Sequence, residues 1–493
     1  MSKDKKETGQ AAQPERKYAE TYGGLFGAML PLLVMIGLMV VLVAAGMRST
    51  RNFWAAGYFS VLTGFLVYKD KKAFQKAMID GVRDNIFAFM IACFLLAGVM
   101  SKILSSSHLI DALLYVLSRA HLTPALLPLL CFFICVVLSS ATGSAAGALN
   151  TAGPVLIPLA VGMGCDVNLI CGSLLAGSCF GDNLAPISDT TIASSLSQEV
   201  DVMRVVRSRL KYALLAGAMS VTAYVIVGFW QAGQGGQAAA LSASVDGTYV
   251  SSLVFLLVPA LVVVLMLRGS GLFTSLLVSE AVGLVLLFAF GYLTPAQLFA
   301  ADGLIASAFD GMIGSIVFIL FIFVMVSLIT EAGVLDAILR WMQKRAKSER
   351  SAEIAAGAMV SIMGVVISSG TSAITFCGPI IRKLLRPFKI DRARAANFLD
   401  GLGCGVGYLV PTNPGCLNLA AIAVASGVVA QGYNAVSFVG YNFHSMALTL
   451  VFWFAILSGF GRKHETDAEL LADGIEPETA GRELTAKNGS QTS

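Results

Sequence analysis

Residues 174–191 read LLAGSCFGDNLAPISDTT, and this stretch places two carboxylates, Asp182 and Asp189, in a segment apolar enough to cross a bilayer. A carboxylate at the centre of a bilayer costs about 2.5–3.5 kcal/mol on insertion scales. Pro186 prevents a regular helix from running through the pair, because proline lacks an amide hydrogen and collides with the preceding turn. Broken backbone at membrane depth is tolerated only where it is buried in protein or lines a watery cavity. The stretch therefore predicts a membrane protein that holds a cation beside two acidic side chains.

The composition of the whole chain is that of a helical membrane protein. Of its 493 residues, 56% are hydrophobic and 13% are charged, whereas soluble proteins carry about a quarter charged residues. The net charge of +4 is too small to indicate a nucleic-acid partner. The sequence has no Walker loop for ATP, no nucleophile–base arrangement and no metal-ligand spacing. We therefore expect a multi-pass membrane protein, surrounded by lipid, that is not an enzyme and carries no cofactor.

Long apolar segments recur between residues 25 and 460. Because one crossing needs about 20 residues, they predict about 10–12 spans. Several segments are too short to cross alone and are expected to be half-helices or arms of re-entrant hairpins: 153–163, 374–386 and 416–430. The predicted fold class is an all-α polytopic membrane protein with broken helices.

Three local matches indicate that the chain contains two copies of one unit. In each match the second sequence lies 225 residues after the first: GPVLIPL at 153–159 with GPIIRKL at 378–384, LIDALL at 109–114 with VLDAIL at 334–339, and Ala185-Pro186 with Val410-Pro411. A shared offset favours an internal repeat over chance similarity between apolar helices.

The basic residues predict that the two copies have opposite orientations. Residues 69–83 carry five Lys or Arg, and their counterpart at 292–312 carries none; residues 382–394 carry six, and their counterpart at 159–170 carries none. Since basic loops stay on the cytoplasmic side, equivalent loops lie on opposite sides of the membrane. This predicts an inverted-topology repeat, which many secondary transporters share. The expected divisions are a cytoplasmic tail at 1–22, transmembrane repeats at 23–230 and 250–460, an external linker at 231–249 and a cytoplasmic tail at 461–493.

Each half has two interruptions rich in Gly, Ser or Pro. They are Ser139–Gly153, Gly181–Thr191, Ser368–Gly378 and Gly403–Gly415. Interruptions of this kind free carbonyl oxygens and helix ends to bind ions or substrate near the middle of the membrane. Because the repeat pairs them, we expect the four breaks to converge on one central site.

Oxygen ligands around the acidic pair favour a hard cation. We expect Asp182, Asp189, Ser188 and Thr190 to bind Na⁺, and a carboxylate at this place can take a proton instead. A site that holds either Na⁺ or a proton, but not both, is sufficient for exchange. The competing interpretation is that both aspartates only cap the N-termini of half-helices; capping and ligation can also coexist.

The neutral breaks are expected to complete the site from the other side. The candidates for contacting substrate are Asn413, Thr412, Asn183, Ser144, Ser369 and Thr371. An asparagine at a helix break can also be purely structural. Two further acids are candidates for a proton relay, Glu280 within an apolar segment and Asp400 ahead of the last break. Glu280 could equally bond to a neighbouring helix.

The run Phe180–Thr191, FGDNLAPISDTT, resembles the signature FGDxxxPxSDTT of the NhaC family of sodium/proton antiporters, in the ion transporter superfamily. Supporting similarity runs through Thr142–Pro158 and Glu331–Leu339. The resemblance implies a multi-spanning inner-membrane carrier that exchanges Na⁺ for protons, with Asp182 and Asp189 as its functional residues. It also implies a family broad enough to include coupled exchange of small organic acids.

The chain departs from the family pattern at two breaks. The family's Trp-Gly-Thr element is replaced by Ala146-Gly147-Ala148, and Asp400 stands one place out of register with the family acid. Loss of hydroxyls and bulk would widen the pocket. We therefore predict a Na⁺/H⁺ antiporter working by alternating access. The alternative is Na⁺- or H⁺-coupled transport of a small organic anion or amino acid, and a homodimer is left open.

Overall fold

The computed structural model describes residues 18–45, 47, 50–119, 123–186, 188–234, 247–337 and 347–472. Within these ranges the chain is helical, and its β pairing is limited to two isolated bridges. The predicted linker at 231–249 and the two predicted tails lie largely outside the described residues.

The first half contributes ten α-helices and one 3₁₀ turn. They are α1 (Gly24–Ala44), α2 (Thr50–Val67), α3 (Lys71–Val82), α4 (Asn85–Ser106), α5 (Leu109–Arg119), η1 (Pro124–Leu126), α6 (Leu127–Thr142), α7 (Ala145–Gly162), α8 (Val167–Leu184), α9 (Asp189–Ser197) and α10 (Val202–Gln234).

The described part of the second half follows a similar order. It comprises η3 (Gly247–Leu256), α11 (Leu257–Leu267), α12 (Leu272–Ala289), α13 (Pro295–Phe299), α14 (Leu304–Glu331), α16 (Glu349–Ile367), α17 (Gly370–Leu385), η4 (Arg386–Phe388), α18 (Arg392–Gly407), α19 (Pro414–Ala425), η5 (Ala435–Ser437), η6 (Val439–Tyr441), α20 (Phe443–Ser458) and α21 (Asp467–Ala472).

The described residues form nine helical segments long and apolar enough to cross a membrane, or ten if the bent pair at 435–441 and 443–458 makes one span. Apolar segments of about 18–20 residues match the thickness of a bilayer core. The prediction of a multi-pass helical membrane protein is confirmed at this level.

Helix boundaries recur at the offset that the sequence matches gave. The starts of α7, α8 and α9 lie at 145, 167 and 189, and those of α17, α18 and α19 lie at 370, 392 and 414, each 225 residues later. The ends of α6 and α16, at 142 and 367, keep the same spacing. The inverted orientation of the two copies stays a prediction.

The four breaks are shorter than predicted. The first is confined to Gly143 and Ser144, because α7 begins at Ala145, and its counterpart is confined to Ser368 and Ser369. Gly143 and Ser368 both adopt the left-handed conformation, and the serine after each caps the next helix. Small residues within these segments are therefore helical, and only the cap positions are broken.

Glycines in α8 allow it to pack directly on α6. A Cβ atom at Gly177 would lie 2.2 Å from the carbonyl oxygen of Phe132, and one at Gly181 would lie 2.5 Å from the carbonyl oxygen of Val136. Such distances leave no room for a side chain between the two helices. The sequence of α8 thereby fixes the position of the acidic break relative to α6.

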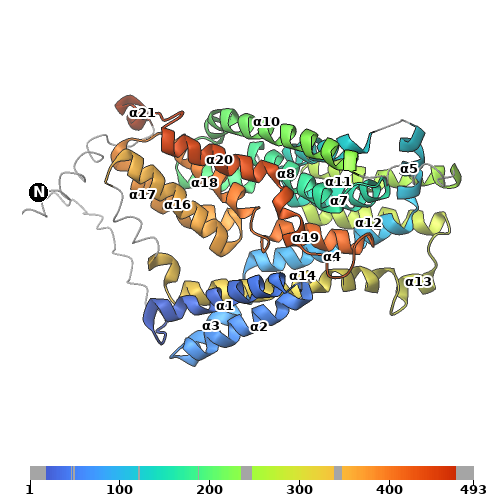
Figure 1. The fold of residues 1–493 in the computed structure, drawn as a ribbon, viewed down its shortest axis with the longest axis horizontal. Coiled ribbons are helices and arrows are strands. Elements are labelled where there is room, and N and C mark those ends of the chain that lie inside the picture. The colour runs from blue at the N-terminus through green and yellow to red at the C-terminus, as the bar shows by residue number, and fades with distance from the viewer. Residues whose placement is uncertain are drawn as a thin grey trace, which may run out of the picture.

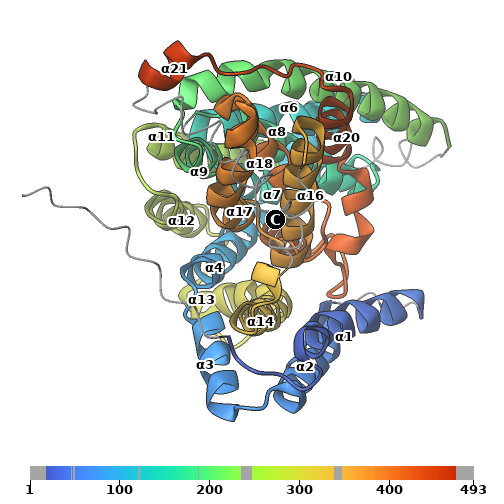
Figure 2. The same ribbon diagram turned by 90° about the vertical axis from the view of Figure 1, so that its left-hand side faces the viewer.

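The helices surround α14, which packs against α2, α3, α4 and α19. Seen along the helices, α1, α2 and α3 lie on one side of α14, and α16, α17 and α18 lie on the other (Figure 2). The start of α1 and the short helix α21 lie at the same end of the bundle (Figure 1). The breaks lie between the two ends, within the helical core.

Candidate functional site

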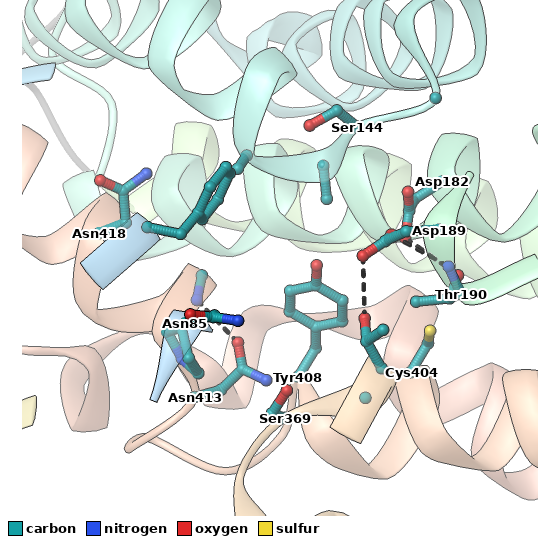
Figure 3. A pocket seen from close by; sticks show the side chains of 18 residues that line it. Asn85, Ser144, Asp182, Asp189, Thr190, Ser369, Cys404, Tyr408, Asn413 and Asn418 are labelled. Carbon is teal, nitrogen blue, oxygen red and sulfur yellow. Dashed lines mark hydrogen bonds between the residues drawn. The ribbon is translucent and has the colours of Figure 1, made fainter. Parts of the chain in front are cut away.

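A cavity of about 570 Å³ lies where the breaks of the two halves meet (Figure 3). From the first half it is lined by Asn85, Phe89, Gly143, Ser144, Ala145, Ala146, Asp182, Asp189 and Thr190, and from the second half by Ser369, Gly370, Thr371, Cys404, Tyr408, Asn413, Pro414, Gly415 and Asn418. Three of the four breaks contribute cap residues to this lining, namely Ser144, Ser369 and Asn413.

Asp182 lies in the last turn of α8 and is 3% exposed. Its Oδ1 accepts a hydrogen bond from the hydroxyl of Ser188 at 2.9 Å, and its Oδ2 accepts a longer one from Thr190 at 3.5 Å. The two hydroxyl oxygens lie 2.9 Å from each other. Asp182, Ser188 and Thr190 therefore form one cluster of oxygen atoms across the break.

Asp189 is the first residue of α9, on the other side of the same break. Its Oδ1 accepts from the backbone N–H of Thr190 at 3.0 Å, and its Oδ2 accepts from the hydroxyl of Thr371 at 3.1 Å. Thr371 belongs to α17, so this contact joins the acidic break to the second half of the chain.

Neither carboxylate in the cavity is paired with a Lys, Arg or His side chain among the residues that the structure describes. Both accept hydrogen bonds from neutral groups only. Asp189 is exposed, but Asp182 is buried, and its hydroxyl donors do not neutralise a carboxylate whose unpaired buried charge is expensive. A bound cation or a bound proton removes that cost, so the arrangement has the chemistry of a cation or proton site.

The third acid near this region, Asp400 on α18, lies outside the cavity lining. It forms a fully buried ion pair with Arg209 of α10. Asp400 also accepts from the Asn183 amide at 3.0 Å and from the Thr191 hydroxyl at 3.1 Å. Because the charge of Asp400 is already compensated by Arg209, Asp400 does not need a cation, unlike Asp182 and Asp189.

Arg209 connects the acidic break to the second half. Its guanidinium donates to the backbone oxygen of Asn183 at 2.5 Å and to the Thr191 hydroxyl at 3.0 Å, which are on either side of the break. It also donates to the Asn397 side chain on α18 at 2.9 Å. Arg209 thus holds both ends of the break against the helix that carries Asp400.

Sequence reasoning did not single out Arg209, which is one of four basic residues between positions 204 and 211. Its position on the helix could have indicated that it is buried. Residues two apart on a helix point to nearly opposite faces, so Arg209 faces away from Arg207 and Lys211, both of which are exposed.

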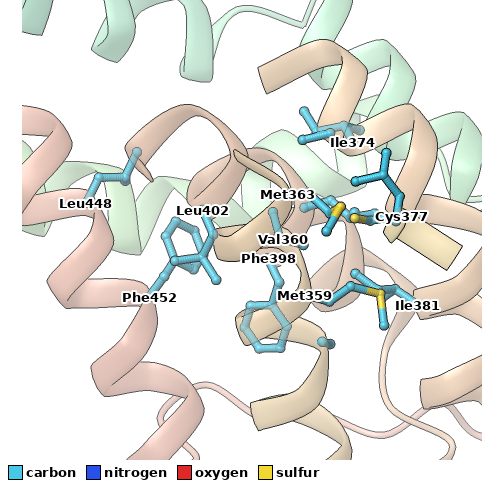
Figure 4. Close-up of a cluster of buried hydrophobic side chains, with 14 of the residues drawn as sticks. Met359, Val360, Met363, Ile374, Cys377, Ile381, Phe398, Leu402, Leu448 and Phe452 are labelled. Carbon is cyan, nitrogen blue, oxygen red and sulfur yellow. The ribbon is translucent and has the colours of Figure 1, made fainter. Parts of the chain in front are cut away.

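The surroundings of Asp400 are apolar on the side away from Arg209. Phe398 and Leu402, two residues before and after it on α18, belong to the main hydrophobic cluster together with Leu448 and Phe452 (Figure 4). The rings of Phe398 and Phe452 meet edge to face at 6.3 Å. This packing fills the face of α18 opposite Asp400.

The other predicted residues fall into two groups. Ser144, Ser369 and Asn413 line the cavity, as Thr371 does. Thr412 and Asn183 do not; Thr412 shares a hydrogen bond of 2.7 Å with Ser368, and Asn183 bonds to Asp400.

Glu280 also lies away from the cavity. It is 5% exposed on α12, a helix that packs against α4 and α11. Its Oε1 has no hydrogen-bond partner among the described residues.

Comparison with known proteins supplies independent information on this chain. A family model described as the Na⁺/H⁺ antiporter family matches residues 18–229, a range that includes the acidic break and Arg209. The malate-2H⁺/Na⁺-lactate antiporter of Bacillus subtilis (strain 168) is 25% identical over 247 residues, which are 48% of this chain and about half (52%) of that protein.

Two further relatives align over more of the chain. The Na⁺/H⁺ antiporter NhaC of Alkalihalophilus pseudofirmus is 25% identical over 355 residues, covering 68% of this chain and 76% of the relative. The arginine/ornithine antiporter ArcD of Halobacterium salinarum is 25% identical over 438 residues, covering 84% and 88%. All three relatives are named as antiporters, and their named substrates include organic anions and amino acids.

Proposed function

We propose that this chain is a secondary Na⁺/H⁺ antiporter that works by alternating access, since the Na⁺/H⁺ antiporter family model matches residues 18–229 and an NhaC antiporter is among its relatives. We place it in the bacterial inner membrane with both termini cytoplasmic. Its transported ions are Na⁺ and protons, and the ion gradients drive the exchange.

One observation carries the proposal. Asp182, which is buried, and Asp189, which is exposed, line the same cavity from opposite sides of one helix break and have no basic partner among the described residues, whereas Asp400 close by is paired with Arg209. A purely structural role would favour compensation of all three charges. Two uncompensated carboxylates in a shared cavity favour a site that takes up cations.

Competition for the same oxygens explains exchange. Na⁺ is a hard cation that prefers oxygen ligands. Asp182 with the hydroxyls of Ser188 and Thr190, and Asp189 with the hydroxyl of Thr371, offer such ligands around one helix break. Protonation of a carboxylate removes its charge and weakens Na⁺ binding, and bound Na⁺ disfavours the proton. Each ion therefore displaces the other. The site can change its access from one side of the membrane to the other without unpaired carboxylate charge only when Na⁺ or protons are bound to it.

We also propose that the two halves form an inverted repeat and that they move relative to each other around the cavity. Helix boundaries 225 residues apart support the repeat, and the basic loops support its inversion. Contacts such as Asp189 with Thr371 cross between the halves at the cavity. Relative movement of the halves would break and remake these contacts, as rocking transporters require.

Sodium-dependent proton flux in proteoliposomes tests the proposal. Asp189→Asn is expected to abolish the flux while the protein still inserts and elutes as a folded species. The matched control is Asp302→Asn, which removes an exposed carboxylate from the loop ahead of α14. Flux at the wild-type level in Asp189→Asn would overturn the assignment of the site.

A second function is favoured by the size of the cavity. About 570 Å³ is far more than a single ion needs and falls within the range of small-molecule sites. Asn85, Asn413 and Asn418 add amide groups to the lining, and amides can both donate to and accept from a carboxylate or an amino acid. The second candidate is therefore cation-coupled exchange of a small organic anion or amino acid.

Thermal stabilisation by solutes separates the two functions. If the chain is a simple cation/proton exchanger, Na⁺ alone stabilises the purified protein, and malate, lactate, arginine and ornithine add nothing. If an organic solute stabilises it only when Na⁺ is present, the second function replaces the first. Asp182→Asn serves as the control, because both functions require its carboxylate.

A further inference from the structure

A second polar cavity, of about 520 Å³, lies at the start of α10 and shares no residue with the cavity at the acidic break. Its lining comes from α10, α18 and the segment that follows α20: Asp201, Arg204, Arg207, Ser208, Lys211, Tyr212, Asp391, Arg394, Asn397, Gly461, Lys463, His464 and Glu469. Five of these residues are Lys or Arg, and three are Asp or Glu. The cavity is therefore basic.

The acids in this lining are already engaged. Asp391 lies 3.0 Å from Arg204 and caps α18 through the N–H of Ala393. Asp201 accepts from the backbone N–H of Arg204 at 2.9 Å. Glu469 accepts from Thr466 at 2.8 and 3.0 Å and lies 4.0 Å from Arg204.

Three of the basic residues have no carboxylate partner within the described ranges. They are Arg207, Lys211 and Lys463. Lys211 lies instead 4.8 Å from the ring of Tyr212, and the backbone oxygen of Lys463 accepts from the Asp391 N–H. These cations leave the cavity with positive charge that an anionic group can neutralise.

An apolar surface begins beside the basic cavity. Leu210 and Leu214 on α10 are 45% and 54% exposed, and Leu457 and Phe454 on α20 are 46% and 57% exposed. Helices α10 and α20 pack side by side; α10 is a candidate membrane span, and α20 belongs to the bent pair that can form a further one. A basic pocket at the end of such a surface fits a molecule with an anionic head and apolar chains better than a free anion.

We propose that this cavity binds the phosphate headgroup of an anionic phospholipid, with its acyl chains against the exposed faces of α10 and α20. Basic pockets between membrane helices at the cytoplasmic surface recognise such headgroups. The phosphate would lie among Arg207, Lys211 and Lys463. The proposal stands on its own residues and does not depend on which ion or solute the protein transports.

The C-terminal segment covers this site and ties it to the helices beneath. Glu465 pairs with Arg392 at 2.8 Å, and Arg462 pairs with Glu353 of α16 at 2.6 Å. The backbone also pairs between residues 389–391 and 463–465. A bound lipid would thus contact α10, α18 and this segment together.

One lining residue connects the lipid site to the acidic break. Asn397 donates to Ser208 at 2.7 Å in the cavity wall, and its oxygen accepts from Arg209, which pairs with Asp400. A headgroup that orders the cavity wall would therefore act on the ion pair that holds the break. A bound anionic lipid would in this way also support transport, because it would stabilise the ion pair beside the acidic break.

Native mass spectrometry of the full-length, delipidated protein tests the site. Wild-type protein is expected to retain one phosphatidylglycerol molecule in preference to phosphatidylcholine. Arg207→Gln/Lys211→Gln is expected to weaken this retention about 30-fold, because two basic contacts with an anionic lipid are lost. Lys72→Gln/Lys383→Gln, which removes two exposed charges elsewhere, is expected to bind as the wild type does.

Three results would overturn the proposal: equal retention by the Arg207/Lys211 variant, equal retention of phosphatidylcholine, or equal thermal stabilisation by inorganic phosphate alone. The last would assign the cavity to a free anion. If the double variant fails to fold, Lys463→Gln alone, at an exposed position of the same lining, must still reduce retention of phosphatidylglycerol.

Discussion

Replacing a buried carboxylate by its amide should have very different effects at two neighbouring positions. Asp400→Asn is expected to destabilise the protein strongly, whereas Asp182→Asn is expected to leave its stability nearly unchanged. Both side chains are almost fully buried. The difference lies in their partners, since Asp400 is paired with Arg209 and Asp182 meets only hydroxyls.

The magnitudes follow from what each change leaves behind. Asp400→Asn leaves the guanidinium of Arg209, itself 0% exposed, without a counter-charge, and breaking one partner of a buried ion pair costs about 3–5 kcal/mol. Without Na⁺, a bound proton removes the cost of the buried charge at Asp182, so Asp182→Asn exchanges one neutral group for another, and the new amide oxygen still accepts from Ser188. We expect a change within about 1 kcal/mol, the worth of a typical hydrogen bond.

Unfolding in detergent can be followed with a thiol-reactive fluorescent dye. Of the eight cysteines whose side chains the structure describes, all are free and all but Cys165 are buried, so labelling reports loss of the fold. Saturating Na⁺, at about 100 times its dissociation constant, should stabilise the wild type by about 2.7 kcal/mol. Asp182→Asn should lose that gain.

Arg209→Gln/Asp400→Asn is the control for the ion pair. Removing both charges should restore part of the lost stability, with a coupling energy of about 0.5–3 kcal/mol between the two positions. Equal unfolding temperatures for Asp400→Asn and wild type, or strict additivity of the two single changes, would refute the reasoning.

Three further changes are expected to have specific effects. Thr371→Val removes the hydroxyl that donates to Asp189 at 3.1 Å and should weaken apparent Na⁺ affinity about 3–10-fold in flux assays; an unchanged affinity would exclude Thr371 from the site. Gly177→Ala would place a Cβ atom 2.2 Å from a carbonyl oxygen of α6 and should cost about 1–3 kcal/mol in thermal unfolding, whereas Gly37→Ala, where a Cβ meets no described atom within 4 Å, should cost nothing. Glu280→Gln should leave Na⁺-dependent proton flux intact, because Glu280 lies away from the cavity; loss of flux would make it a relay.

The sequence was informative where polar chemistry interrupts an apolar helix. Asp182, Pro186 and Asp189 stand out because carboxylates and a helix-breaking proline are costly in a segment that crosses a bilayer and are retained there for a function. The same local pattern located three cap residues of the cavity lining, Ser144, Ser369 and Asn413. Local composition could find these positions because each of the three residues caps the N-terminus of a helix.

The extent of the breaks could not be predicted in the same way. Composition cannot distinguish a glycine that ends a helix from one that lets two helices touch. Gly401 lies inside α18, where a Cβ atom would meet the ring of Phe452 at 1.9 Å. Its role is packing, which depends on a residue 51 positions later in the chain. For this reason the Gly-rich stretches looked broken while most of their residues are helical.

The partner of Asp400 was also beyond local sequence. Arg209 and Asp400 lie 191 residues apart and on different halves, so only the packing of α10 against α18 brings them together. An acidic residue in an apolar segment therefore has two explanations, a site or a buried ion pair. The structure separates them by showing which carboxylates have a basic neighbour.

Both copies of the repeat have the helix break, but only the first copy carries acidic residues there. The residues 225 positions after Asp182 and Asp189 are Gly407 and Pro414, neither of which can bind a cation through its side chain. The second half gives the cavity Ser369, Thr371 and Asn413 instead. Two symmetric backbone breaks thus produce one acidic locus facing neutral hydrogen-bonding groups. Such a division permits a cation to bind on one side while a polar solute occupies the other, so the same backbone can serve ion exchange or ion-coupled solute exchange, depending on the residues at the neutral break.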